Sequence, residues 1–387
     1  MNNSVAGDHD VIFITEAYPT EDDPVFTFVR QLVCAIADTG VKCAVVAPQS
    51  IVKALFRGKK LRPYHWIDKT TAGNGAEIYQ PKYLSFSNIR LFGYLLSDLF
   101  AMLSIVPVVN KLINKNTILY GHFWHRGIIA AKIGKKKKLP VFIACGEAKI
   151  TIRDSFPKNF IEKHIDAITG VICVSTKNLN ESIESGLASA EDCIVVPNAI
   201  DSNIFYIEDK LKQRERLGFD KDDFIVAFTG YFIERKGVFR LSKAIDMVGG
   251  IKSIFIGEGN QRPDCDGILF CGKLPHKEIV HYLSSADVFV LPTLAEGCCN
   301  AIIEAMACGL PIISSNLSFN DDILNNACSI RVNPNDCNAI ANAIIKLKDD
   351  TVLRSSMSKA AYERSKELEI MNRATRILRF IEEKTQL

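Results

Sequence analysis

Short apolar runs alternate with amphipathic stretches along the first half of the chain. Residues 11–15 form the first apolar run, followed by a polar segment with two prolines and a periodic apolar stretch over residues 26–37. This order predicts a strand, a loop and a helix. Further runs of strand length lie at residues 42–47, 118–120, 141–144, 171–174 and 194–196. Strands that alternate with helices predict a parallel, doubly wound α/β sheet.

The pattern restarts after a predicted connector at residues 197–205. Residues 225–228 read as a strand, and residues 238–248 as a helix that follows a glycine-containing turn. Later strands are expected at residues 253–256, 268–271, 288–291 and 311–314, before a helical stretch at 351–384. The chain is therefore predicted to hold two Rossmann-like halves, and a cleft between them is the default place for a ligand.

Residues 91–110 form the best candidate for a membrane-spanning helix. The stretch is long enough, but Asp98 lies near its middle and Pro107 near its end. A carboxylate at the centre of a span costs roughly 2.5–3.5 kcal/mol on insertion scales. We therefore expect a buried or interfacial helix at this position.

Composition narrows the class of protein. The 387 residues are 48% hydrophobic and 24% charged, with a net charge of +3, which argues against a disordered chain, a fibre or a small disulfide scaffold. The 12 cysteines include no CxxC pair, and the polar N-terminus does not resemble a secretory leader. Reduced thiols and a cytoplasmic location are the expectation.

The small net charge hides a strong asymmetry. Residues 42–138 contain 17 Lys or Arg against three acidic residues, a net charge of +14, so the rest of the chain totals −11. Such a stretch predicts a basic face for nucleic acid, anionic lipid headgroups or phosphorylated substrates. A four-lysine run at residues 135–138 either contributes to that face or forms a solvated loop before the strand at 141–144.

One basic cluster is mixed with large apolar residues, among them Leu55 and Phe56. This mixture is expected of a surface that enters a membrane interface. The cluster consists of Lys53, Arg57, Lys59, Lys60 and Arg62.

The segment after the strand at residues 288–291 carries the most informative chemistry. Glu296 lies in a loop before a helix that is expected to start near Cys299, and Glu304 lies on that helix. Gly297 lets the backbone approach a ligand, and the free N–H groups of the first turn favour a phosphate. One carboxylate can hold the cis-diol of a ribose while the other holds sugar hydroxyls. The alternative is an amphipathic helix with two solvated glutamates.

Three further loops follow strands of the second half. The turn from Gly230 to Gly237 places Arg235 and Lys236 at the carboxyl end of a strand, where they can neutralise a diphosphate, or where they are simply exposed at a helix start. Gly257 and Gly272 begin two other loops, which offer backbone groups to a nucleotide.

The order of these motifs over residues 224–315 resembles the retaining GT-B glycosyltransferases of family 4. The matching series is Gly-x-x-x-x-Arg-Lys-Gly, Gly-Glu-Gly, Gly-Lys-Leu, Ala-Asp-Val-Phe-Val-Leu-Pro-Thr and Glu-Gly-(six residues)-Glu-Ala-Met-Ala-Cys-Gly. The resemblance implies two Rossmann-like domains facing a cleft, a nucleotide-diphosphate sugar as substrate, transfer with retention, and neither cofactor nor metal. It implies an acceptor-side domain over residues 1–200, a donor-binding domain over 201–365, and a helix at 366–387 that packs back on the first domain.

The resemblance also implies roles for single residues. Lys236, with Arg235, would bind the diphosphate, Glu296 the transferred sugar and Glu304 the donor ribose. The remaining donor contacts that it implies are Gly230, Gly257, Gly272, Lys273, Leu274, Gly297, Cys298, Cys299, Asn300 and Ala301.

The sequence departs from the family pattern in the phosphate turn and in the first half. Tyr231 stands where the family usually has an arginine, so Arg235 is a candidate substitute. Cys145 stands where the family often has a histidine, which brings in Glu147 as a replacement. His122, after the strand at 118–120, is a third acceptor-side candidate, or a packing histidine.

The leading functional prediction is a hexosyltransferase of cell-surface polysaccharide synthesis (capsule, O-antigen or exopolysaccharide). It would transfer a hexose or N-acetylhexosamine to a lipid-linked saccharide, and a UDP-sugar is the preferred donor. The basic, partly apolar cluster predicts peripheral attachment to the anionic inner face of the membrane, with no nucleic-acid partner. The alternatives are a nucleotide-sugar 2-epimerase and a non-catalytic nucleotide-sugar-binding partner of another transferase.

Overall fold

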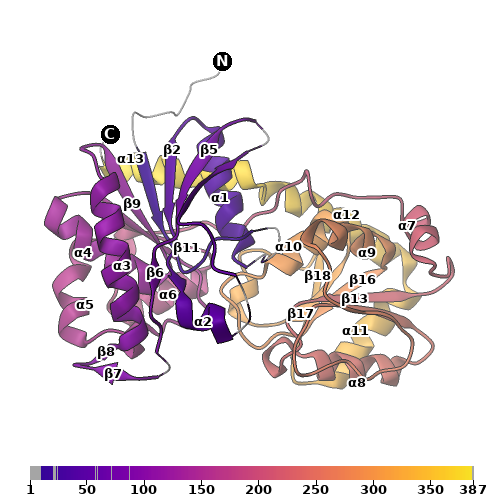
Figure 1. Ribbon diagram of the computed structural model, residues 1–387. Helices are drawn as coiled ribbons and strands as arrows, with labels where there is room; N and C mark the ends of the chain where they lie inside the picture. The colour runs from indigo at the N-terminus through magenta and orange to yellow at the C-terminus, as the bar shows by residue number, and fades with distance from the viewer. Residues whose placement is uncertain are drawn as a thin grey trace, which may run out of the picture. The chain divides into compact units, whose positions relative to one another are not determined.

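The chain folds into two compact units in a computed structural model (Figure 1). The structure describes residues 10–20, 23, 25–56, 58, 60–70, 72–86 and 88–385. Unit 1 consists of Met1–Val196 and Ile370–Leu387, and unit 2 consists of Pro197–Glu369. The chain therefore passes from one unit to the other twice.

Unit 1 is built on an eight-stranded sheet. Its strands, in spatial order, are β12 (Cys193–Val195), β11 (Gly170–Cys173), β10 (Val141–Cys145), β9 (Thr117–His122), β1 (Asp10–Ile14), β2 (Lys42–Val46), β5 (Gly75–Tyr79) and β4 (His65–Lys69). All neighbours are parallel except β4 and β5. Two small ribbons pair β3 (Gln49–Ser50) with β6 (Lys82–Tyr83) and β7 (Arg90–Leu91) with β8 (Tyr94–Leu95).

Helices cover the sheet of unit 1. They are α1 (Thr27–Asp38), α2 (Ile51–Phe56), α3 (Leu96–Leu112), α4 (Trp124–Lys137), α5 (Lys158–Ile165), α6 (Thr176–Glu184) and α13 (Ile370–Thr385), with short 3-10 turns η1 (Ile152–Asp154) and η2 (Ala190–Asp192). Figure 1 shows α3, α4 and α5 side by side, while α13 packs against α1 and β11. A Cβ on Gly170 would come within 2.8 Å of Phe380, so α13 lies tightly against the sheet.

The helix predicted to be buried or interfacial starts later than expected. Residues 94–95 belong to the β7–β8 ribbon, and α3 begins only at Leu96. Asp98 is buried and accepts a hydrogen bond from the Arg126 guanidinium at 3.2 Å, which compensates its charge inside the protein. Across the part of the chain that the structure describes, no helix combines the length and apolar character that crossing a membrane requires.

The four-lysine run is not a loop. Residues 135–137 form the last turn of α4, and Lys138 ends it in the left-handed conformation. The apolar face of α4 continues to Ile133, so the helix is already docked when the run begins. Lysine is a good helix former, and its charge is favourable near a helix C-terminus, so the helix continues to Lys137.

Unit 2 contains a six-stranded, wholly parallel sheet. Its strands, in spatial order, are β15 (Ile268–Gly272), β14 (Lys252–Ile256), β13 (Ile225–Thr229), β16 (Val288–Leu291), β17 (Ile312–Ser315) and β18 (Ser329–Val332). The strand order reverses between β13 and β16. Ligands of open α/β sheets bind at the carboxyl ends of strands at such a switch point.

Six helices surround this sheet, and their apolar faces complete the core. They are α7 (Lys210–Leu217), α8 (Val238–Val248), α9 (Ile279–Ser285), α10 (Asn300–Ala307), α11 (Cys337–Asp349) and α12 (Thr351–Glu367), with 3-10 turns η3 (Glu234–Lys236), η4 (His276–Glu278) and η5 (Ser318–Asn320). The predicted fold class, α/β with two Rossmann-like parallel-sheet domains, is confirmed.

Candidate active site

Two loops meet at the switch point of unit 2. One follows β13 and carries η3, and the other follows β16 and leads into α10. Gly237, at φ +81°, joins them closely: a Cβ there would lie 2.5 Å from the carbonyl oxygen of Pro292. Leu294 N–H donates to the carbonyl of Arg235 at 2.8 Å. The backbone of one loop therefore holds the other in place.

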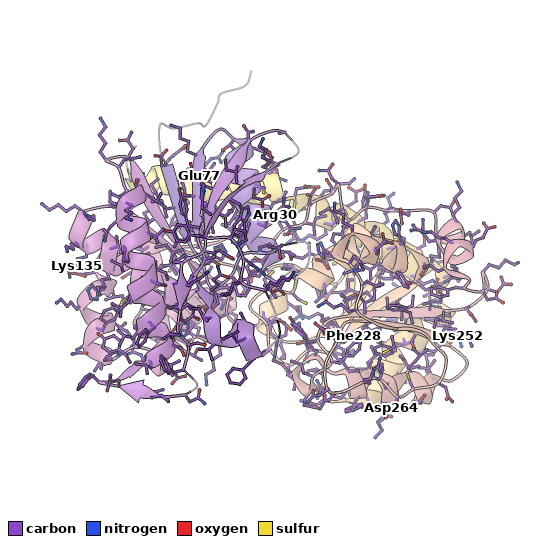
Figure 2. All side chains as sticks on the ribbon, in the orientation of Figure 1. Arg30, Glu77, Lys135, Phe228, Lys252 and Asp264 are labelled. Carbon is purple, nitrogen blue, oxygen red and sulfur yellow. The ribbon has the colours of Figure 1, made fainter. Side chains whose placement is uncertain are left out.

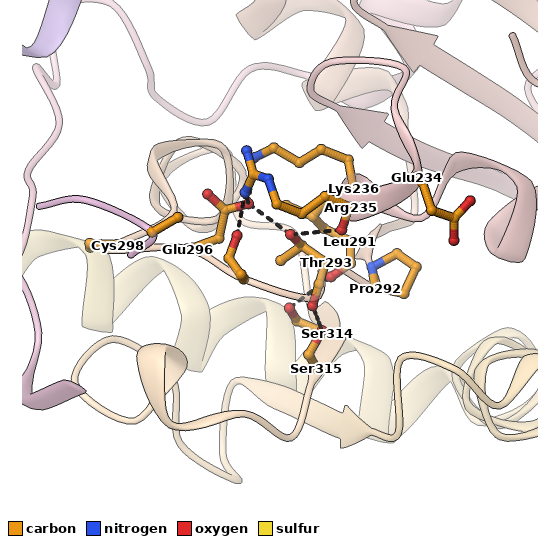
Figure 3. Close-up of polar contacts among 12 residues, drawn as sticks. Glu234, Arg235, Lys236, Leu291, Pro292, Thr293, Glu296, Cys298, Ser314 and Ser315 are labelled. Atoms are coloured by element: carbon orange, nitrogen blue, oxygen red, sulfur yellow. Dashed lines mark hydrogen bonds and ion pairs between the residues drawn. The ribbon is translucent and has the colours of Figure 1, made fainter. Parts of the chain in front are cut away.

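A charged cluster lies where these loops touch (Figure 3). Lys236 Nζ is 2.6 Å from Glu296 Oε1, and Arg235 Nη1 is 3.0 Å from the same oxygen. Thr293 Oγ1 donates to it at 2.7 Å. The side chains of Glu296 and Lys236 are only 11% and 12% exposed. Two cations against one carboxylate leave a net positive charge, which suits an anionic ligand.

The loop after β16 passes directly into the N-terminus of α10. Gly297 and Cys299 are buried, Cys298 is half-buried, and no side chain of a described residue caps the helix at Cys299. Burial raises the pKa of the Cys299 thiol to about 11, so the thiol stays neutral. At this end of α10, the backbone N–H groups of Asn300 and Ala301, in the first turn, are the polar groups that can meet a ligand.

Glu304 has a partner that the sequence analysis missed. Its Oε1 lies 3.1 Å from Nε2 of His276, which belongs to η4 just after β15. The Phe205 ring meets the imidazole edge-on, at 5.0 Å between centroids. Burial alone would lower the pKa of His276, but the hydrogen bond and charge of Glu304 outweigh it, so the pKa is raised. A histidine two residues beyond the predicted Gly-Lys-Leu contact is the signal that was available.

Gly257 allows the loops after β13 and β14 to approach closely. A Cβ on Gly257 would lie 1.9 Å from the carbonyl oxygen of Gly230, whereas one on Gly272 would meet nothing closer than 3.6 Å. Gly257 N–H donates to the Gly272 carbonyl at 2.8 Å, and Lys273 pairs with Glu258 at 3.0 Å. The loops after β13, β14 and β15 thus gather at one edge of the sheet, and Leu274 packs against the core there.

Two of the three acceptor-side candidates of unit 1, Cys145 and His122, are buried. Cys145 is fully buried in the core, where the Ser182 hydroxyl donates to its Sγ at 3.5 Å, so it has no surface for a substrate. Glu147 accepts from Trp124 N–H at 2.7 Å and Gly146 N–H at 2.9 Å. Its carboxylate therefore satisfies the open N-terminus of α4.

His122 is also an interior residue. Its ring lies among Phe28, Tyr120 and Phe123, with 3% of the residue exposed. Burial, with a smaller contribution from the charge of Arg373, lowers the pKa of His122 to about 3. Its Nδ1 has no hydrogen-bond partner among the described residues. The reading of His122 as a packing histidine fits this environment better than substrate contact.

The basic cluster divides between surface and interior. Lys53 and Lys60 are exposed, and Phe56 on α2 is 89% exposed. Arg62, in contrast, pairs with Asp23 at 2.9 Å and donates to the Tyr18 carbonyl, so its guanidinium is held by the protein rather than offered to a membrane. Two members of the cluster, Arg57 and Lys59, lie outside the described residues. No three His, Cys, Asp or Glu side chains of the described ranges gather as a metal site.

Comparisons with known sequences relate this chain to glycosyltransferases. The family model Glycosyl transferases group 1 matches residues 209–364. The glycosyltransferase TuaC of Bacillus subtilis, provisionally assigned to teichuronic acid biosynthesis, is 25% identical over 374 residues, which cover 91% of this chain and 92% of TuaC. The capsular polysaccharide biosynthesis glycosyltransferase CapM of Staphylococcus aureus is 25% identical over 290 residues, 68% of this chain and 75% of CapM.

A third relative is named for its donor and acceptor. It is the UDP-Gal:α-D-GlcNAc-diphosphoundecaprenol α-1,3-galactosyltransferase of Escherichia coli, 26% identical over 206 residues, 48% of this chain and 52% of the relative. Two solved structures share the fold. Sucrose-phosphate synthase of Thermosynechococcus elongatus superposes with a TM-score of 0.75 at 18% identity, over 98% of this chain and all of that one. Anabaena Alr3699/HepE, solved with UDP-glucose, gives 0.68 at 16% identity, with the same two shares.

Proposed function

Because this chain belongs to the glycosyl transferases group 1 family, we propose that it transfers a hexose or N-acetylhexosamine from a nucleotide-diphosphate sugar to a lipid-linked saccharide. The charged cluster of Lys236, Arg235 and Glu296 beside the N-terminus of α10 carries the proposal. It combines cations and backbone N–H groups for a diphosphate with a carboxylate for sugar hydroxyls, at the switch point of a parallel sheet.

In the proposed donor complex, Lys236 and Arg235 bind the diphosphate together with the first N–H groups of α10. Glu296, released in part from its two cations by the incoming phosphates, accepts hydrogen bonds from the transferred sugar. Glu304 accepts from the ribose hydroxyls, and His276 holds that carboxylate in position. The loop from Gly272 to Leu274 meets the base. A UDP-sugar is favoured because a structural neighbour was solved with UDP-glucose and a relative is named for UDP-Gal.

The reaction breaks the bond between the anomeric carbon and the diphosphate and forms a bond from that carbon to the acceptor hydroxyl oxygen. The acceptor attacks from the face that the diphosphate leaves, which retains the configuration, and its proton passes to the departing phosphate oxygen. Lys236 and the α10 dipole stabilise the charge that develops on the diphosphate. Glu296 is engaged by two cations and a hydroxyl, so we assign it to sugar binding rather than to nucleophilic attack.

Unit 1 and the relatives support a lipid-linked acceptor and a membrane location. One relative is named for a diphosphoundecaprenol acceptor, and another for capsular polysaccharide. On α2, Lys53 lies beside Leu55 and Phe56, which are 75% and 89% exposed. We propose that this helix, with Lys60, brings the enzyme to the anionic inner face of the cell membrane as a peripheral protein, with a role in surface polysaccharide synthesis.

The decisive experiment measures the release of nucleoside diphosphate from UDP-, GDP-, ADP- and dTDP-sugars, with and without lipid-linked saccharides, together with the mass of the product. We expect transfer from a UDP-sugar. Glu304→Ala should weaken donor binding, whereas Glu363→Gln on the exposed side of α12 should not. Donor binding without turnover on any acceptor would favour a non-catalytic partner, and a changed sugar without an acceptor would favour an epimerase.

A separate experiment tests the membrane part. The full-length protein is floated with vesicles of phosphatidylglycerol and phosphatidylcholine, and with phosphatidylcholine alone. Phe56→Ser combined with Lys53→Gln should reduce binding to the anionic vesicles by about tenfold or more. The control Ile67→Ser removes another exposed apolar side chain of unit 1, on β4, and should bind like the wild type. Equal binding of all three proteins would remove α2 from the proposal.

A further inference from the structure

A cavity of about 480 Å³ lies between α3, α4 and α5, on a part of unit 1 that the proposed reaction does not use. Figure 1 shows these three helices side by side, and Figure 2 labels Lys135 on the same side of the unit. Four lysines line the cavity, together with the neutral polar side chain of Asn110 and an imidazole. Lys132, Lys135, Lys136, Lys163 and His164 contribute to the wall, and no carboxylate does.

The lysines of this cavity have little compensation. Lys135 pairs with the exposed Asp166 at 2.8 Å. Lys132 Nζ contacts the sulfur of Met102 at 3.6 Å and lies 5.7 Å from the centre of the Phe160 ring, neither of which carries a negative charge. Among the described residues, neither Lys136 nor Lys163 has an acidic partner within ion-pair distance. Several positive charges thus face one space with a single carboxylate nearby.

Burial and the crowding of the lysines lower the pKa of side chains in the cavity. Burial, and then the charges of Lys136 and Lys163, lower the pKa of Lys132. Burial also lowers the pKa of His164, and three of the lysines lower it further, although its hydrogen bond to the Phe160 carbonyl at 2.8 Å acts in the opposite direction. An anion in the cavity would relieve this repulsion, because it would interact with several ammonium groups at once.

We propose that this cavity is a binding site for a phosphoryl group, carried either by a small phosphate ester or by the headgroup of an anionic phospholipid. A phosphate dianion offers several acceptor oxygens to several ammonium groups, which a single carboxylate cannot do. The volume exceeds that of the phosphate, so there is space for a glycerol or sugar substituent. Val106 and Ile133 supply an apolar wall, and Leu103, one turn before Val106 on α3, is 57% exposed.

The site does not rest on the proposed transferase reaction. All of its residues belong to unit 1, whereas the cluster around Glu296 belongs to unit 2. Its loss should therefore leave sugar transfer to a water-soluble acceptor unchanged. Failure of this site and failure of the proposed function can be told apart in the same protein preparation.

The test compares two triple variants of equal charge. The site variant carries Lys132→Gln, Lys136→Gln and Lys163→Gln. The control carries Lys42→Gln, Lys115→Gln and Lys158→Gln, three exposed lysines of unit 1 outside the cavity. Titration calorimetry at low salt uses sn-glycerol 3-phosphate and inorganic phosphate. Flotation uses phosphatidylglycerol-containing vesicles against pure phosphatidylcholine.

We expect the site variant to lose about 30-fold or more in affinity for at least one of these probes, and the control less than about threefold. A loss of soluble-ester binding in the site variant assigns the site to a small phosphate ester, and a loss of vesicle binding alone assigns it to a lipid headgroup. Equal losses in both variants would indicate diffuse surface attraction and overturn the proposal, as would the absence of binding to either kind of probe in the wild type.

A second readout is local to the cavity and requires no activity. The pKa of His164, followed by NMR through its ring proton, should rise when sn-glycerol 3-phosphate is added to the wild type. In the folded site variant the pKa of His164 should start higher and no longer respond, because the charges of Lys132 and Lys163 and the bound ligand are lost. A His164 pKa that is indifferent to saturating ligand would place the bound phosphate elsewhere.

Discussion

His276 Nε2 lies 3.1 Å from Glu304 Oε1, so the carboxylate proposed to hold the donor ribose is already oriented by an imidazole from a neighbouring loop. The two residues come from η4 and α10, which follow different strands of the same sheet. Since the pKa of His276 is raised, its protonated form is the one that the fold favours. The pair therefore links the stability of unit 2 to pH.

The sign of this link can be tested with His276→Gln. A raised folded-state pKa means that the contribution is fully present below the ordinary histidine value of about 6.5 and is lost as the pH rises through the folded value. We expect the variant to be less stable than the wild type by about 1 kcal/mol at pH 5.5 and by clearly less at pH 9. Denaturant unfolding at the two pH values measures this difference in stability. A difference that does not depend on pH would contradict the link between the His276–Glu304 pair and stability. In a protein that carries Glu304→Gln, His276→Gln should no longer produce the pH-dependent difference.

Lys236 should act on the chemical step. Lys236→Met removes the ammonium group proposed to stabilise the leaving diphosphate, so we expect kcat to fall by about 10²–10³-fold. Lys243→Met, which removes an exposed lysine from α8, serves as the control and should keep nearly full activity. Steady-state kinetics with the identified donor measures kcat and KM of the two variants. A variant that changes only KM would assign Lys236 to ground-state binding.

Gly257 should be essential to the fold of unit 2. In Gly257→Ala, the new Cβ would collide with the carbonyl oxygen of Gly230, and we expect a loss of about 2–4 kcal/mol in the free energy of unfolding. Gly272→Ala adds the same methyl group one loop away with no contact under 3.6 Å, and should cost less than about 1 kcal/mol. Similar melting temperatures for the two variants would show that the loops do not pack as described.

Glu147 should behave as a helix cap. Glu147→Ala leaves the N–H groups of Trp124 and Gly146 without their acceptor, which should reduce stability by about 1–3 kcal/mol. The acceptor KM of the folded fraction should not change. Glu162→Ala, at an exposed position of α5, is the matched control. An increased acceptor KM at unchanged stability would return Glu147 to the acceptor site.

His122 should make unit 1 sensitive to acid. Its folded-state pKa is lowered to about 3, so below about pH 6.5 the unfolded chain binds a proton that the folded one does not, and stability falls as the pH falls. At pH 5 this costs about 2 kcal/mol relative to pH 7.5. His122→Phe keeps a ring among the surrounding aromatics and should remove that part of the pH dependence. If the stability of His122→Phe and of the wild type changed equally with pH, this role of His122 would be refuted.

The local signals of unit 2 are readable from the sequence because each depends on neighbours in the chain. The strand at 288–291 and the helix at 238–248 have the bounds expected of them, and α10 begins one residue after Cys299. Strand β4 escapes notice because its side chains, His65 to Lys69, alternate between half-buried and exposed without a continuous apolar run.

Contacts between distant segments could not be read in this way. The partner of Glu304 is 28 positions away and depends on how two loops meet across the sheet. The orientation of Cys145 depends on which face of β10 its position selects and on the packing of α6 through Ser182. A family pattern indicates which position is informative, but the packing around it decides whether the side chain reaches a ligand.

The placement of α13 has a consequence for how the protein is made. Residues 1–196 leave the ribosome before the helix that covers β11 and α1 has been synthesised, whereas residues 197–369 form a continuous segment that can complete its own core. Unit 2, although it is translated later, is therefore the first unit that can fold completely. Unit 1 keeps an uncovered apolar surface until α13 has been synthesised. Chaperone demand during synthesis should concentrate on that interval.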